Sequence, residues 1–183
     1  MSDQAASARP RIRGAVVRWT VTLAIVAGII GVYLRPAGLA YVGRRLGEGR
    51  LHAPELALIA HAPLVVQLHL LTVLLGFGIG TIQMLAPKGT VPHRVLGWVF
   101  VLFMMFTALD ALFIKAGPTW RVTPIQIFSL FVLIGLPFAV IAARRHDVRA
   151  HARGMSGVYF GGLILAGFFT LIPGRLLWQV FFG

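Results

Sequence analysis

The sequence contains no cysteine, and this absence excludes several classes of chemistry. Without cysteine the chain forms no disulfide, carries no thiolate nucleophile and cannot hold zinc or an iron–sulfur cluster through sulfur. Any metal or cofactor must therefore be bound through histidine, methionine or oxygen atoms.

Charged residues are also scarce, and acidic residues are the scarcest. Only 12% of the 183 residues are charged, whereas 58% are hydrophobic; soluble domains carry about a quarter charged residues. Lys and Arg number 17 against 5 Asp and Glu, for a net charge of +12. The basic residues cluster between apolar segments, so we interpret them as loops held against acidic lipid headgroups and not as a nucleic-acid surface. The composition predicts an integral membrane protein.

Several catalytic motifs are absent as well. The chain has no phosphate-binding Walker loop, no G-x-S-x-G, no H-E-x-x-H and no pair of carboxylates inside a span. The G-x-G at Gly76 to Gly78 lies inside an apolar segment, so it is not a dinucleotide-binding fingerprint.

Five apolar segments are long enough to cross a membrane as helices, so we expect an all-α integral membrane protein with five transmembrane helices. We expect a basic cytoplasmic tail before them, an extracytoplasmic loop after the first helix with a short interfacial helix around 39–46, a four-helix bundle over 61–173 and an interfacial C-terminal segment. The short links between the last four helices favour an antiparallel bundle. The tail covers 1–14, the loop 35–60 and the C-terminal segment 174–183, and the spans are 15–34, 64–86, 95–114, 125–143 and 154–172.

The distribution of Lys and Arg predicts the orientation of these helices. The loops 88–94 and 144–153 would lie on the same side as the N-terminus. With the four arginines of the N-terminal region, that side carries ten Lys and Arg, against seven on the opposite side. The positive-inside rule then places the N-terminus in the cytoplasm of a bacterium, with the helices in its inner membrane.

Polar residues inside the expected spans are the candidates for a function. On a helix His69, Gly76 and Gln83 share one face. Gly76 and Gly80, like Gly157 and Gly161 in the last span, favour close helix packing. For His69 and Gln83 two interpretations stay open: hydrogen bonds to neighbouring helices, or contact with a ligand.

His93 and His151 stand near the starts of two expected spans on the same side of the membrane. One interpretation is a basic cluster that fixes the orientation and binds acidic lipid. The other is that both histidines ligate one b-type haem, with Gly97 leaving room for its flat ring and three arginines near its propionates: Arg94, Arg149 and Arg153.

Asp110 is predicted to be paired, because an isolated carboxylate inside a span is costly. Arg175 or Arg121 from a neighbouring helix end is the expected partner, in preference to Lys115, and the role would be structural.

The sequence resembles a family of bacterial predicted membrane proteins of unknown function. The likeness covers roughly 56–178 and is most specific at H-R-V-L-G-W (His93 to Trp98); the H-x-x-x-M at His151 and the terminal Arg175 also fit it. The family implies a four-helix unit and no settled activity.

A looser resemblance is to the cytochrome b561 type, whose four core helices hold two haems by pairs of histidines. His93 and His151 match the pair from the second and fourth core helices. His69 matches half of the other pair, but residues 125–143 contain no histidine, which argues against two haems.

Two functional classes remain. One is a redox membrane protein with a b-type haem or a quinone site. The other is a non-enzymatic accessory or assembly subunit packed on a larger membrane complex.

Overall fold

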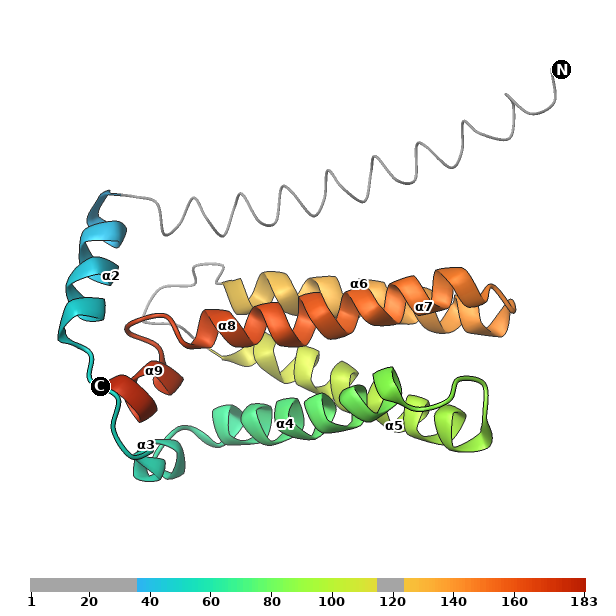
Figure 1. The fold of residues 1–183 in the computed structure, drawn as a ribbon, viewed down its shortest axis with the longest axis horizontal. Helices are drawn as coiled ribbons and strands as arrows, with labels where there is room; N and C mark the ends of the chain where they lie inside the picture. The colour runs from blue at the N-terminus through green and yellow to red at the C-terminus, as the bar shows by residue number, and fades with distance from the viewer. Residues whose placement is uncertain (1–35, 115–123) are drawn as a thin grey trace, which may run out of the picture. The chain divides into compact units, whose positions relative to one another are not determined.

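The computed structural model describes residues 36–114 and 124–183, which are helical and contain no strand (Figure 1). The first expected span, 15–34, lies outside the described residues, as do Lys115 and Arg121. The chain divides into two compact units, residues 1–48 and 49–183. Each is described by itself.

In the first unit the described part is a single helix, α2 (Pro36–Glu48). The glycine-rich sequence led us to expect an irregular loop here with a helix over only 39–46. The helix is longer at both ends. Its last turn carries an exposed pair in which Arg45 lies 4.0 Å from Glu48.

The second unit contains four helical segments that are long and apolar enough to cross a membrane: Leu64–Leu85, Val91–Phe113, Ile125–Arg144 and Val148–Thr170. The first is α4 (Leu64–Leu85), and the second is α5 (Val91–Asp110) continued by η1 (Ala111–Phe113). The third is α6 (Pro124–Arg144). The fourth runs through α7 (Val148–Gly157), η2 (Val158–Leu165) and α8 (Ala166–Thr170).

Two of these segments begin earlier than their apolar runs. Thr90 caps α5, and its hydroxyl accepts a hydrogen bond from the backbone nitrogen of His93. Asp147 caps α7 in the same way, with Ala150 as donor at 2.9 Å. Side-chain caps satisfy the free N–H groups of a first turn, so polar first turns extend both helices beyond the runs from which we predicted them.

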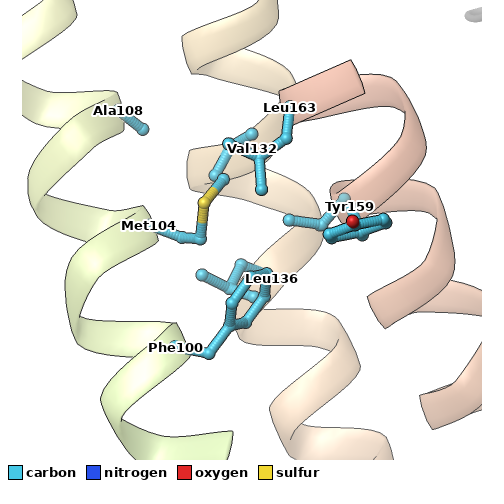
Figure 2. Close-up of a cluster of buried hydrophobic side chains, with 8 residues drawn as sticks. Phe100, Met104, Ala108, Val132, Leu136, Tyr159 and Leu163 are labelled. Atoms are coloured by element: carbon cyan, nitrogen blue, oxygen red, sulfur yellow. The ribbon is translucent and has the colours of Figure 1, made fainter. Parts of the chain in front are cut away.

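The four segments lie side by side (Figure 1). α4 packs on α5, α5 on α6, and α6 on both α7 and η2, while η2 returns to α4. Their shared core contains Phe100, Met104 and Ala108 of α5, and it also contains Val132, Leu136, Val158, Tyr159 and Leu163 (Figure 2).

The glycines of α4 allow this close packing, as predicted. A Cβ at Gly80 would lie 2.6 Å from the ring of Tyr159 and 2.8 Å from that of Phe100. A Cβ at Gly76 would lie 3.3 Å from the sulfur of Met104. At Gly78, by contrast, a Cβ would have nothing within 4 Å. Of these three glycines, Gly76 and Gly80 therefore lie on a packing surface of the described residues, and Gly78 does not.

Two short helices meet at one end of this unit. The segment leading into α3 (Leu56–Ala60) pairs with α9 (Leu176–Phe182) through backbone hydrogen bonds from His52 to Phe181 and from Glu55 to Val180, at 3.1 and 3.0 Å. Trp178 and Val180 of α9 are buried. We had expected residues 174–183 to lie along the membrane interface. The structure shows that two of their side chains contribute to packing inside the protein.

The fourth spanning segment contains an element that the sequence did not reveal. Residues Val158–Leu165 form a π-helix between two α-helical turns. Such wide turns are rare and frequently occur at functional sites. Here the wide turn carries the core residues Tyr159 and Leu163.

Candidate functional site

Polar side chains gather where α4 ends and α5 begins. Nε2 of Gln83 donates a hydrogen bond to the carbonyl of His93 at 2.8 Å. The ammonium of Lys88 donates to three carbonyls near the end of α4, those of Gln83, Met84 and Ala86, at 2.6 to 2.9 Å. These contacts satisfy carbonyls that a helix end leaves free and fix the position of His93.

His93 itself has an unusual environment. Its Nδ1 is buried and has no hydrogen-bond partner among the described residues, and the same is true of Oε1 of Gln83. Buried polar atoms without partners are uncommon in folded proteins, and each calls for an explanation. The charges of Lys88 and His151 also exert an electrostatic influence on His93.

His151, in the first turns of α7, is oriented by the neighbouring helix. Its Nδ1 lies 3.0 Å from the carbonyl oxygen of Ala139 in α6. A carbonyl can only accept, so this contact places the proton of a neutral imidazole on Nδ1 and leaves a lone pair on Nε2. Histidines that bind metals are commonly oriented by a bond of this kind.

The three arginines assigned to this site are all exposed: Arg94, Arg149 and Arg153. Arg153 donates from Nε to the carbonyl of Arg149 at 3.1 Å.

One expectation at this site was wrong. We expected Gly97 to leave room beside α5 for a flat ring. Instead, a Cβ at Gly97 would lie 3.0 Å from Nε2 of Gln83. The side chain of Gln83 occupies that space because it reaches across to the carbonyl of His93.

A second polar site lies toward the opposite end of α5. Nδ1 of His69 in α4 lies 2.7 Å from Oδ1 of Asp110, and the side chains are 17% and 9% exposed. Asp110 is therefore paired, as predicted, but with a histidine where we expected an arginine. Both residues could be identified in the sequence. Their contact depends on how α4 and α5 are aligned against each other, and the sequence of neither helix alone shows that alignment.

The His69–Asp110 pair has unsatisfied polar neighbours. Oδ2 of Asp110 and the hydroxyl oxygen of Thr107, one turn earlier, are buried without partners among the described residues. The hydroxyl of Thr72 bonds within its own helix, to the carbonyls of Leu68 and His69. The pair therefore lies among polar atoms that retain bonding capacity.

Two polar contacts escaped the sequence analysis. The hydroxyls of Thr81 and Tyr159 lie 2.7 Å apart. Gln67 donates to the carbonyls of Ala60 and Ala62, which joins α4 to the end of α3. A buried tyrosine hydroxyl usually has a hydrogen-bond partner, but the sequence does not identify that partner.

No group of three or more metal-ligating acidic or histidine side chains occurs within residues 36–114 and 124–183. A site built from this part of the chain would therefore use at most two such ligands. A haem iron, which takes four ligands from its own ring, is compatible with that number.

Comparison with known proteins identifies the family. No curated protein and no solved structure matches the chain. The family model described as "Predicted membrane protein (DUF2306)" matches residues 66–182, which contain nearly all of α4 and everything after it. This match confirms the resemblance based on the H-R-V-L-G-W element and the residues around it. The protein belongs to the DUF2306 family of predicted membrane proteins.

Proposed function

We propose that the protein is a redox protein of the bacterial inner membrane in which His93 and His151 bind one b-type haem. The orientation of His151 carries the proposal. Its Nδ1 is held by the carbonyl of Ala139, so that Nε2 keeps a lone pair for iron.

His93 is the second ligand in this proposal. It lies in the first turn of α5, and His151 lies in the first turns of α7, so both belong to helix starts. The electrostatic influence of His151 on His93 supports this pairing of the two ligands. Because Gln83 fills the space at Gly97, a haem would have to lie away from that face of α5.

The protein itself would bind the haem and orient the two histidines that ligate it. The haem, when bound, would supply one-electron chemistry. Ala139 fixes the imidazole of His151, and the Thr90 cap together with Gln83 fixes the start of α5. Arg94, Arg149 and Arg153 would offer positive charge to the propionates, and the same side chains would bind acidic lipid.

The proposal includes an arrangement in the membrane. The spans from α4 to α8 would form an antiparallel bundle preceded by a fifth helix, with the N-terminus in the cytoplasm. The basic residues next to α5 and α7 would then lie on the cytoplasmic side, in accord with the positive-inside rule.

An absorbance spectrum tests the haem. Protein expressed with ample haem should show a Soret band that shifts on reduction with dithionite. His93→Ala and His151→Ala should each abolish it, whereas His61→Ala should retain it, because His61 is exposed and its Nδ1 contacts only the carbonyl of Ala57 among the described residues. A wild-type protein without Soret absorption would refute the proposal.

The alternative is a non-enzymatic subunit that packs on a larger membrane complex. The apolar surface of α4 supports it, since only 17% of the apolar window of this span, as of the fourth span, is buried among the described residues. Exposed apolar side chains run along this helix, among them Leu71, Leu74, Phe77 and Ile82. A colourless protein that crosslinks through Leu74→Cys to one defined membrane partner would support this function over the first.

A further inference from the structure

The His69–Asp110 pair has no part in the proposed haem site. His93 stands in the first turn of α5 and Asp110 is its last residue, so about 25 Å of helix separate them at about 1.5 Å per residue. An ionisable pair inside a spanning segment is costly, though less so near the end of the segment, and it commonly marks a site for an ion or a substrate.

The membrane determines which protons the pair holds. A net charge inside a bilayer is unfavourable, so the pair is most stable when it is neutral overall. A neutral pair has one proton between Nδ1 of His69 and Oδ1 of Asp110 and a second on Nε2. This holds whichever side chain owns the shared proton, provided that Oδ2 of Asp110 carries none, and Nε2 is then a hydrogen-bond donor.

That donor is available. Within the described residues, the ring of His69 makes one hydrogen bond, the 2.7 Å contact with Asp110 through Nδ1. Its Nε2 is not among the buried atoms without partners, and the side chain retains 17% exposure. A ligand can therefore approach Nε2 from outside the pair.

The surface beside the pair is apolar and aromatic. Phe106 of α5 and Phe113 of η1, about one turn either side of Asp110, are 48% and 72% exposed. Leu68, next to His69, is also exposed. A flat apolar ring with a carbonyl oxygen fits a single donor in such surroundings, whereas a charged or sugar-like ligand would leave its polar groups unpaired.

We propose that the His69–Asp110 pair binds the carbonyl oxygen of a membrane-soluble quinone through Nε2 of His69. Asp110 is a positioning residue that holds the ring and keeps Nε2 protonated. The choice of a quinone over other apolar carbonyl compounds rests on the proposed redox function. The hydrogen bond itself does not require the haem.

Titration with ubiquinone-1 tests this site. The full-length protein is placed in phosphatidylcholine nanodiscs free of quinone, and heats of binding are corrected with empty nanodiscs, since the ligand also partitions into lipid. Wild type should bind saturably. His69→Phe should weaken binding about tenfold or more, as expected for loss of one charge-assisted hydrogen bond.

Two further variants make the test specific. Asp110→Asn can still hydrogen-bond Nδ1, through its oxygen or its amide N–H, but it removes the carboxylate that pairs with an imidazolium. Binding should therefore weaken while the fold is retained. His61→Phe is the matched control, the same substitution at an exposed histidine outside the pair, and should bind as wild type does.

The outcomes separate the two proposals. Absence of saturable binding, unchanged affinity in both pair variants, or equal loss in His61→Phe would overturn the quinone site. The absorbance spectrum of the same samples reports on the haem independently. A Soret band without quinone binding refutes only the quinone site, and quinone binding without a Soret band refutes only the haem.

Discussion

The hydroxyls of Thr81 and Tyr159 lie 2.7 Å apart, although 78 residues separate them in the chain. Thr81 also donates to the carbonyl of Phe77 at 2.8 Å, so its oxygen can accept the proton of Tyr159. The ring of Tyr159 stacks on that of Phe77. The contact joins α4 to the π-helix. It also gives the hydroxyl of Tyr159, the only polar group of this core side chain, a hydrogen-bond partner.

Tyr159→Phe should therefore destabilise the protein by about 0.5–1.5 kcal/mol, the net value of a hydrogen bond. The ring and its packing remain, so the loss reports on the hydroxyl alone. Unfolding in mixed detergent micelles measures the change. Thr81→Ala and the double variant complete a cycle. Additive effects of the two substitutions would show that the hydroxyls do not interact.

Gly80→Ala should be strongly destabilising. The added Cβ would lie 2.6 to 2.8 Å from the rings of Tyr159 and Phe100, and rings confined in a core cannot move away freely. Overpacking of this kind costs about 1–3 kcal/mol. The measurement is the midpoint of thermal unfolding in detergent.

Gly78→Ala is the matched control on the same helix. Its Cβ would meet nothing within 4 Å, and alanine favours helix over glycine by about 1 kcal/mol in aqueous peptides. Its stability should equal or exceed that of wild type. A similar loss in both variants would mean that helix propensity, and not contact with Tyr159, explains the effect.

The spans of the described region could be predicted well because an apolar run of about 20 residues is typical of a transmembrane helix. The residues 64–86 and 125–143 that we expected nearly coincide with α4 and α6. The starts of α5 and α7 were missed, because the hydrophobic pattern does not reveal the caps that Thr90 and Asp147 provide. The packing role of Gly76 and Gly80 was also readable, because their spacing places both on one face.

Partners across helices could not be predicted in the same way. His69 and Asp110 are 41 residues apart, and their contact depends on the rotation and depth of α4 against α5. Gln83 illustrates the same limit, because its reach to His93 removes the space that Gly97 seemed to offer. The π-helix that carries Tyr159 and Leu163 was not predicted either.

Single-cysteine labelling tests the proposed orientation, and the absence of natural cysteines makes the background clean. Arg145→Cys, in the exposed turn between α6 and α7, should be protected from an impermeant maleimide in intact cells and react after permeabilisation. Leu51→Cys, before α3 and 76% exposed, should react in intact cells. The reverse pattern would invert the topology.

The His69–Asp110 contact should also contribute to stability. His69→Leu leaves the carboxyl of Asp110 buried without its partner, and a buried polar group of this kind costs about 1–3 kcal/mol. Asp110→Leu should cost less, because an imidazole is more easily satisfied at the 17% of its side chain that is exposed. The double variant replaces the pair by apolar groups and should recover much of the loss, as replacement of buried ion pairs often does. Unfolding of all four proteins in detergent gives the coupling energy, expected at about 0.5–3 kcal/mol. If His69→Leu alone leaves the unfolding midpoint unchanged, the pair does not stabilise the fold, and its cost in the membrane would have to be explained by binding alone.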